Sequence, residues 1–150
     1  MTTFSASLCR ASAMALAAFL AASVGAAEIG QIKVSRGQVT VERKGEVLPS
    51  KVGLRLEPAD VIKTGPDGSV GITMADNSLL SAGPNSILSL DRFDFDPTSN
   101  QGRFDAQLQK GSLAVISGRI AKQSPESMTV RTPSTILGVR GTEFVVAAND

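Results

Sequence analysis

Residues 130–144 read VRTPSTILGVRGTEF, two strand-like pieces broken by Pro133 and Gly138. Proline cannot donate a ladder hydrogen bond, so Pro133 is expected at a strand start, an edge or a bulge. In the second piece, strict alternation would mix a charged side chain with large apolar ones on each face. A β-bulge at Gly141 would reset the alternation, because glycine tolerates the backbone conformation of a bulge. We therefore predict β-strands here, with a bulge at Gly141.

The predicted bulge would bring Arg140 and Glu143 to the same side of the strand. One interpretation is a charged active pair. We favour a structural lock, in which Phe144 is anchored in the core and Arg140 pairs with Glu143 or a nearby backbone carbonyl, because buried charges are normally paired. If that pair is buried, Glu143→Ala should lower the free energy of unfolding by about 3–5 kcal/mol. An unchanged melting temperature would return the segment to the surface as a candidate partner site.

Outward from this segment, the chain reads as short strands between turns. In residues 69–74, Val70, Ile72 and Met74 share one face and alternate with small residues. The preceding residues 65–68 read GPDG, a turn in which proline fixes φ and Asp-Gly supplies positive φ. Further strands are expected at 29–34, 38–42, 60–64, 78–81, 87–90, 104–109, 113–116 and 128–130, with 47–59 irregular, 91–102 loop-like, 119–125 a polar connection and 110–111 a tight turn. Helical periodicity is absent after residue 27, so we predict a single all-β domain.

Residues 65–72 and 83–90 resemble each other at an offset of 18 residues. A glycine-proline turn precedes two apolar positions in each, Val70 and Ile72 in the first and Leu88 and Leu90 in the second. An offset of this size fits one coil of a β-solenoid, in which equivalent residues stack. Any meander with such turns gives the same match. We expect a β-solenoid-like fold of many short strands, with a β-sandwich as the alternative.

The first 27 residues have the pattern of a signal peptide. Arg10 is followed by the apolar run 11–22 and then by small residues up to Ala27, before the first acid at Glu28. These are the three regions of a secretory signal. The run is too short and too rich in alanine for a membrane anchor, which needs about 20 apolar residues. We expect a cleaved signal peptide at 1–27, a domain at 28–150, a periplasmic or secreted location and no membrane span after cleavage.

Composition narrows the chemistry of the predicted domain. The chain has no His, Trp or Tyr, and its one cysteine is Cys9, so the commonest general base and thiol chemistry are missing after residue 27. After residue 27 the basic and acidic residues are equal in number, whereas a nucleic-acid-binding domain usually has an excess of basic residues. Asp94 and Asp96 have the spacing of the first calcium-loop ligands, but the ligands that should follow are absent. A glycosidase would need two carboxylates on opposite sides of a cleft, and nothing in the sequence indicates that any two of Asp91, Asp94, Asp96 and Asp105 converge in this way. We therefore expect no catalytic residues, no cofactor and no metal.

The chain contains a series of turn-rich motifs, which are RGQVTV at 36–41, residues 54–60 leading to IKTG at 62–65, ADNS at 75–78, GPNS at 83–86, LQKG at 108–111, RTP at 131–133 and GVRGTEF at 138–144. In this order the motifs resemble the FecR family of periplasmic regulatory domains. The resemblance points to a stand-alone FecR domain, and it implies an all-β fold and a role in binding and signalling. The family-motif residues at the end of the chain are Arg131, Thr132, Pro133, Gly138, Arg140, Gly141, Thr142, Glu143 and Phe144, which we expect to be structural.

The resemblance also suggests how such a domain works. In the best understood members, a cytoplasmic helical part controls a sigma factor, and a membrane helix joins it to a periplasmic domain that receives a signal from an outer-membrane receptor. The sequence places a signal peptide where those parts would be, so we do not expect direct contact with a sigma factor. We expect a non-catalytic interaction or signalling module that binds a protein partner in the cell envelope, and an exposed sheet edge could accept a strand of that partner. A glycan or cell-wall binding module is the alternative, and the four phenylalanines after residue 27 are its only aromatic platform.

Overall fold

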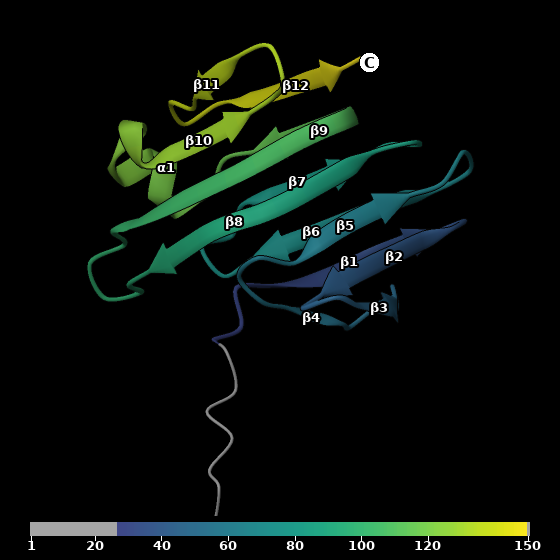
Figure 1. Ribbon diagram of the computed structural model, residues 1–150. Helices are drawn as coiled ribbons and strands as arrows, with labels where there is room; N and C mark the ends of the chain where they lie inside the picture. Colours follow the sequence, from purple (N-terminus) through teal and green to yellow (C-terminus); the bar gives the residue numbers. More distant parts are fainter. Residues whose placement is uncertain (1–26, 150) are drawn as a thin grey trace, which may run out of the picture.

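The computed structural model describes residues 27–149, which fold into an all-β domain (Figure 1). The predicted all-β character is thereby confirmed, whereas the predicted signal peptide lies, apart from Ala27, outside the described residues. The strands are β1 (Gly30–Arg36), β2 (Val39–Arg43), β3 (Glu46–Pro49), β4 (Arg55–Leu56), β5 (Val61–Thr64), β6 (Ser69–Met74), β7 (Leu79–Ala82), β8 (Ile87–Phe95), β9 (Gly102–Ile116), β10 (Met128–Arg131), β11 (Ile136–Gly138) and β12 (Glu143–Ala148). A short helix α1 (Arg119–Gln123) and a 3-10 turn η1 (Pro125–Ser127) separate β9 from β10.

The strands form one curled sheet that folds back on itself. Its order is β3-β2-β5-β8-β9-β7-β6-β1-β4, with β10 and β12 added to β9 and β11 added to β10. Strands β2, β3, β5, β8, β10, β11 and the first half of β9 form what we call the β5 layer. Strands β1, β4, β6, β7, β12 and the second half of β9 form the β6 layer. Figure 1 shows β5 and β8 in front of β6 and β7.

The core lies between the two layers. The alternation predicted for residues 69–74 is confirmed, because Val70, Ile72 and Met74 are buried and the residues between them are half-exposed. From the opposite layer, Leu88 and Phe104 are completely buried in the same cluster. Helix α1 adds Ile120 and Ala121 to the buried residues. Burying each large aliphatic or aromatic side chain contributes about 1.5–3 kcal/mol, so this shared cluster is the main reason why the two layers stay together.

A row of four corners joins the layers along one side, at Gly37, residues 65–68, residues 83–86 and Gly111. Adjacent corners are hydrogen bonded: the Gly65 N–H donates to the Gln38 carbonyl (2.8 Å), and the Asn85 N–H donates to the Gly65 carbonyl (3.0 Å). At each corner the chain passes from one layer to the other. The corners therefore fix how far apart the two layers lie.

Two turn predictions need correction at this row. Residues 110–111 are not a hairpin turn, because β9 runs continuously from 102 to 116 and only bends at Gly111, where φ is +91°. In 65–68, neither Asp67 nor Gly68 has positive φ. Glycine at 68 is required by space instead, since a Cβ atom there would lie 2.4 Å from the Gln38 carbonyl oxygen.

The 18-residue similarity does not correspond to stacked neighbours. Val70 pairs with Ala82 in the β6 layer, whereas Leu88 pairs with Ile62 and Leu108 in the β5 layer. Equivalent positions therefore lie in different layers, and what the similarity does mark is two corners that touch. The corners at 65–68 and 83–86 have similar sequences because the chain reverses direction at both of them.

Three segments predicted as irregular contain regular structure. Residues 47–59 include most of β3 and all of β4, and β8 continues through 91–95 of the predicted loop. The β2–β3 hairpin closes with positive φ at Lys44 and Gly45, as a two-residue turn requires. The polar connection 119–125 contains α1, whose five residues are too few to produce a helical period.

At the end opposite the corners, Asp76 clamps the start of α1. Its Oδ2 accepts hydrogen bonds from the Ser78 hydroxyl (2.8 Å) and the Ile120 N–H (3.3 Å), and its Oδ1 accepts one from the Ser78 N–H (3.0 Å). The Ser78 hydroxyl in turn accepts a hydrogen bond from the Gly118 N–H (2.9 Å). Asp76 and Ser78 are completely buried. This clamp explains the ADNS motif as a structural device that holds the β9–α1 connection.

Asp76→Asn is expected to lower the free energy of unfolding by about 1–3 kcal/mol, because an amide group would face donors with one acceptor oxygen fewer. Urea unfolding of the variant measures this loss. Asp67→Asn is the matched control, since Asp67 is an exposed acceptor of a single hydrogen bond from the Gln38 N–H. Equal losses in the two variants would contradict the clamp.

Candidate interaction surface

The family-motif residues near the end of the chain lie on or beside the turns around β11. Arg131 ends β10, and Thr132 begins a tight turn in which its hydroxyl accepts a hydrogen bond from the Thr135 N–H (3.1 Å). Pro133 is exposed in that turn, and Gly138 ends β11. The remaining residues are distributed between the β11–β12 connection and the start of β12, with Arg140, Gly141 and Thr142 in the connection and Glu143 and Phe144 in the strand.

The predicted bulge and charge lock are wrong. Gly141 has positive φ (+59°), but it lies in the connection between β11 and β12 and not inside a strand. Arg140 and Glu143 are both exposed, and no ion pair joins them in the part of the chain that the structure describes. A turn resolves the mixed alternation that suggested a bulge, so no buried pair is needed. Phe144 is half-buried and packs against the core, as predicted.

A buried ion pair does exist, between Arg43 and Asp60. The guanidinium of Arg43 donates from Nε to Asp60 Oδ1 (2.9 Å) and from Nη2 to Oδ2 (2.7 Å), and also from Nη1 to Glu57 Oε1 (2.9 Å). The Asp60 side chain is 1% exposed. The hydrogen bond to Asp60 raises the pKa of Arg43. The pair ties the loop before β5 to the end of β2, and it was missed in the sequence because its two residues lie 17 positions apart.

The β12 edge is open. In the described residues β12 pairs with β9 alone, and the Ser117 N–H donates to the Thr142 carbonyl (3.3 Å). Because antiparallel bonds alternate, Phe144, Val146 and Ala148 bond to β9. The β7 side of β9 agrees with this alternation. The Gly83 N–H donates to the Ser112 carbonyl (3.0 Å), so Ser112 and every second residue after it in β9 bond to β7, and the residues between them bond to β12. The N–H and C=O groups of Glu143, Val145 and Ala147 therefore point away from the sheet.

The other three edges of the sheet are less suitable for adding a strand. Strand β4 has two residues and β11 has three. Strand β3 has four residues and ends in Pro49, which has no N–H to donate. Strand β12 has six residues and contains neither proline nor lysine, the residues that usually protect an edge.

Beside the open edge, the outer side of the β6 layer carries exposed apolar side chains. We call Val34, Leu79, Ile116 and Val145 the outer apolar face; they are 43%, 43%, 44% and 73% exposed, respectively. Neighbouring registers connect them, because Leu79 pairs with Ile116, and Ala114 pairs with both Ser81 and Val145. Small residues between them (Gly71, Ser81 and Ala114) leave a shallow hollow of about 300 Å³ that also borders Glu143. A strand added to β12 would extend this face.

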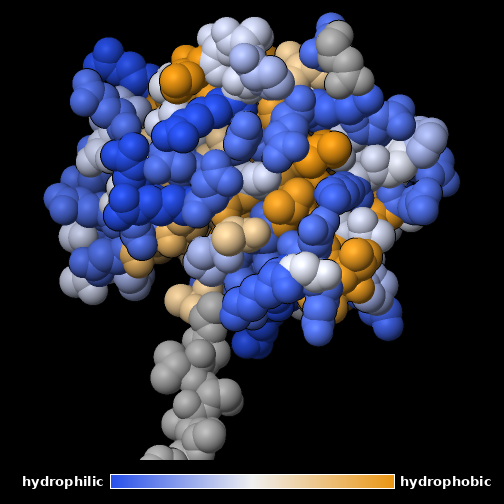
Figure 2. Space-filling view, in the orientation of Figure 1, coloured by the Kyte–Doolittle hydropathy of each residue, from blue (hydrophilic) through white to orange (hydrophobic). Residues whose placement is uncertain are grey.

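The outer side of the β5 layer has a different character. It is turned toward the viewer in Figure 2 and is covered largely by hydrophilic residues. Arg92 pairs with Asp94 (2.6 Å), and Arg103 pairs with Asp105 (2.8 Å). Asp105 Oδ1 is buried without a hydrogen-bond partner. Burial raises the pKa of the neighbouring Asp91. These charges neutralise one another along the strands, and they do not converge on a cleft.

The two aspartates with calcium-loop spacing have separate structural roles. Asp94 is the partner of Arg92, whereas Asp96 caps the loop after β8. It accepts hydrogen bonds from the Thr98 N–H (2.9 Å) and the Ser99 hydroxyl (2.9 Å), which hold its pKa below the usual range. Among residues 27–149 no group of three or more acidic, histidine or cysteine side chains is placed to hold a metal ion.

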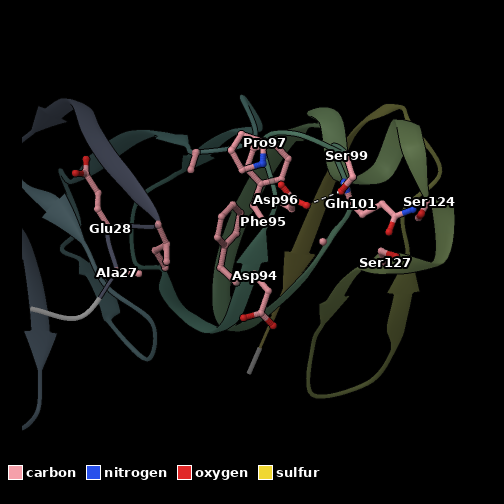
Figure 3. Close-up of a pocket in the computed structure, with 14 residues that line it drawn as sticks. Ala27, Glu28, Asp94, Phe95, Asp96, Pro97, Ser99, Gln101, Ser124 and Ser127 are labelled. Carbon is pink, nitrogen blue, oxygen red and sulfur yellow. Dashed lines mark hydrogen bonds between the residues drawn. The ribbon is translucent and has the colours of Figure 1, made fainter. Parts of the chain in front are cut away.

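A hollow of about 970 Å³ lies where the described chain begins (Figure 3). Phe95 and Pro97 supply apolar surface, and Asp94, Asp96 and Gln101 supply polar groups around it. Ser124 and Ser127 border it from the segment after α1. An aromatic ring with a polar rim is the kind of site that a sugar ring can use.

Most of the described chain matches a known protein family. The family model described as FecR protein matches residues 60–150, a stretch that begins at Asp60 of the buried ion pair and includes the Asp76 clamp and β12. No curated protein and no solved structure matches the chain. Within residues 27–149, no helix has the length and apolar character needed to cross a membrane.

Proposed function

Because the chain belongs to the FecR family, we propose that it is an exported, non-catalytic signalling module that binds a protein partner in the cell envelope. The binding surface in this proposal is the open edge of β12 together with the outer apolar face. Its location is periplasmic or secreted, and it does not touch a sigma factor itself. A sigma factor would be reached only through other proteins.

The open β12 edge is the observation that carries the proposal. Three residues of β12 present outward backbone groups, and Val145 adds an apolar side chain that is 73% exposed. A partner strand would satisfy those backbone groups and also cover Val145 and Ile116. Main-chain hydrogen bonds then supply affinity, and the side chains on alternate positions supply specificity.

Site-specific cross-linking in the cell tests the proposal. A photo-reactive benzoylphenylalanine replaces Val145 in the full chain, and the linked protein is identified by mass spectrometry. The matched control carries the same group at Val47, which is 66% exposed on the β3 edge. We expect an envelope protein to be linked at position 145 and not at position 47. Equal labelling from both positions, or a link to cytoplasmic proteins alone, would overturn the proposal.

Val145→Lys is expected to reduce capture of that partner by at least about tenfold, a loss of about 1.4 kcal/mol of binding free energy. The reason is that a lysine on an edge strand opposes strand addition. Affinity between the purified proteins measures the effect. Val47→Lys places the same charge at a similarly exposed valine, so its affinity should stay within about twofold of the original, which is less than 0.5 kcal/mol.

A cell-wall or glycan ligand remains the second candidate, because the hollow around Phe95 combines an aromatic ring with polar groups. Sedimentation with purified peptidoglycan tests it. If the hollow binds glycan, Phe95→Ala should abolish co-sedimentation while Val145→Lys leaves it unchanged. The reverse pattern would assign any cell-wall association to the β12 edge.

A further inference from the structure

The β12 edge is complementary to itself. Two copies of β12 can lie antiparallel with the two Val145 residues opposite each other at the centre. In this register Glu143 faces Ala147 of the second copy, and Phe144 faces Val146. The residues with outward backbone groups are Glu143, Val145 and Ala147, so the same register matches every outward N–H and C=O with a partner. No other antiparallel register uses all three.

The side chains agree with that register. Glu143 opposes a small neutral residue and not a second Glu143, so no like charges face each other across the pair. Val145 meets another valine on the outer side, and on the inner side Phe144 meets Val146, an aromatic and β-branched pair of the kind that stabilises neighbouring strands. Phe144 is only half-buried in the single chain, so it has surface left to cover.

Shifted registers are less favourable. Moving one copy by two residues in one direction places Glu143 opposite Val145, a charge against an exposed apolar side chain, and loses one pair of outward groups. Moving it further places Glu143 opposite Glu143. Moving it by two residues in the other direction places Val145 opposite Ala147 and leaves both Glu143 residues without a partner in β12. The centred register is therefore the one that the sequence of β12 selects.

We infer that this chain forms a two-fold symmetric dimer in which β12 pairs antiparallel with β12 of a second copy about Val145. The inference rests on the proposed function, because it takes the same edge as the binding surface and names its occupant. Pairing would join the two β6 layers into one continuous sheet. The outer apolar faces of the two copies would then meet at Val145, and the valine side chains that are most exposed in the single chain would be covered. An isologous contact of this kind closes after two copies, so it leads to a dimer and not to a fibre.

Disulfide trapping tests the register. Residues opposed in such a pair have Cα atoms about 5.5 Å apart, within the range of about 4.4–6.8 Å that a disulfide spans. The only cysteine of the chain is Cys9, so Cys9→Ser provides a cysteine-free full-length background. In this background, Val145→Cys should form a covalent dimer under mild oxidation. Val47→Cys, on the β3 edge, and Ile136→Cys, on β11, are exposed controls and should not.

A mixture sharpens the test. Glu143→Cys alone and Ala147→Cys alone should stay largely uncross-linked, whereas an equal mixture of the two should give the mixed dimer. Light scattering on the unmodified mature chain should give twice the mass of one copy, and Val145→Lys should give the mass of one copy with an unchanged circular dichroism spectrum. A single-copy mass for the unmodified chain at every concentration, or equal cross-linking at positions 145, 47 and 136, would overturn the dimer.

The outcomes separate the dimer from the proposed function. A chain that stays monomeric and still links a different envelope protein through position 145 overturns the dimer and supports the proposed partner. A chain that dimerises and whose position 145 links only another copy in the cell supports the dimer and overturns the foreign partner.

Discussion

Arg43→Ala is expected to lower the free energy of unfolding by about 3–5 kcal/mol, because it leaves a buried carboxylate without its cation. Asp60 would keep a hydrogen bond from the Glu57 N–H (2.9 Å) but lose both bonds from the guanidinium. The Arg43 side chain is 21% exposed, so water can reach part of the site and the loss should fall near the lower end of this range. Urea unfolding followed by circular dichroism measures the change.

Two controls isolate the fork of hydrogen bonds from the charge. Arg43→Lys keeps the positive charge but cannot bond both carboxylate oxygens in the same planar geometry, so it should recover only part of the stability. Glu143→Ala removes an exposed carboxylate that has no ion pair among the described residues, and it should change the free energy by less than about 0.5 kcal/mol. A loss for Glu143→Ala as large as that for Arg43→Ala would contradict the assignment of the lock to Arg43 and Asp60.

The predicted pair of Arg140 and Glu143 and the observed pair of Arg43 and Asp60 show why prediction from the sequence failed here. Opposite charges that are close in sequence, such as Arg140 and Glu143, suggest an ion pair because a short segment of chain joins them. The pair that forms is 17 residues apart, since the hairpin of β2 and β3 and the β4 loop bring Arg43 back to Asp60. Nothing local in the sequence encodes that return. A buried polar pair therefore depends on the fold itself, and it could not be found before the fold was known.

Local patterns predicted the strands well where one face is buried and the other is not. Residues 69–74 are such a strand, and the predicted alternation matches the burial of β6. The pattern fails at β8, where Asp91 to Phe95 mixes charged and aromatic residues, because β8 shifts register against β9 between Ser89 and Arg92. That irregularity changes the phase and hides the strand. The β9 bend was likewise mistaken for a turn, since Lys110-Gly111 has turn composition in either case.

The sequence predicted the kind of binding site, an exposed sheet edge, but not its position in the fold. An all-β chain must have edges, so an exposed edge that accepts a strand could be expected from the strand pattern alone. Which strand is open depends on pairing between distant segments: β12 pairs with β9, about 30 residues earlier in the chain, and β10 occupies the other half of the same side of β9. The outer apolar face could not be foreseen either, because Val34 and Val145 are brought onto the same face of the sheet only through four successive strand pairings.

Gly111→Ala is expected to lower the free energy of unfolding by about 3–5 kcal/mol, the combined cost of left-handed backbone in a residue with a Cβ atom and of overpacking. Glycine is needed here for both reasons. Its φ is +91°, and a Cβ atom would lie 2.2 Å from Ser86 Oγ, 2.5 Å from Ser86 Cα and 2.7 Å from the Asn85 carbonyl oxygen. The serine hydroxyl could rotate away, but the two backbone atoms belong to the neighbouring corner and cannot move without separating the corners.

Gly45→Ala separates the two reasons. Gly45 has a similar positive φ (+83°), but a Cβ atom there meets nothing within 4 Å. Its loss should therefore be only the conformational cost of about 1–2 kcal/mol. Urea unfolding of the two variants gives the difference directly, and that difference is the steric contribution of the corner row. If Gly111→Ala and Gly45→Ala are equally destabilised, contact between the corners does not hold the layers at their spacing, and the bend of β9 is set by backbone conformation alone.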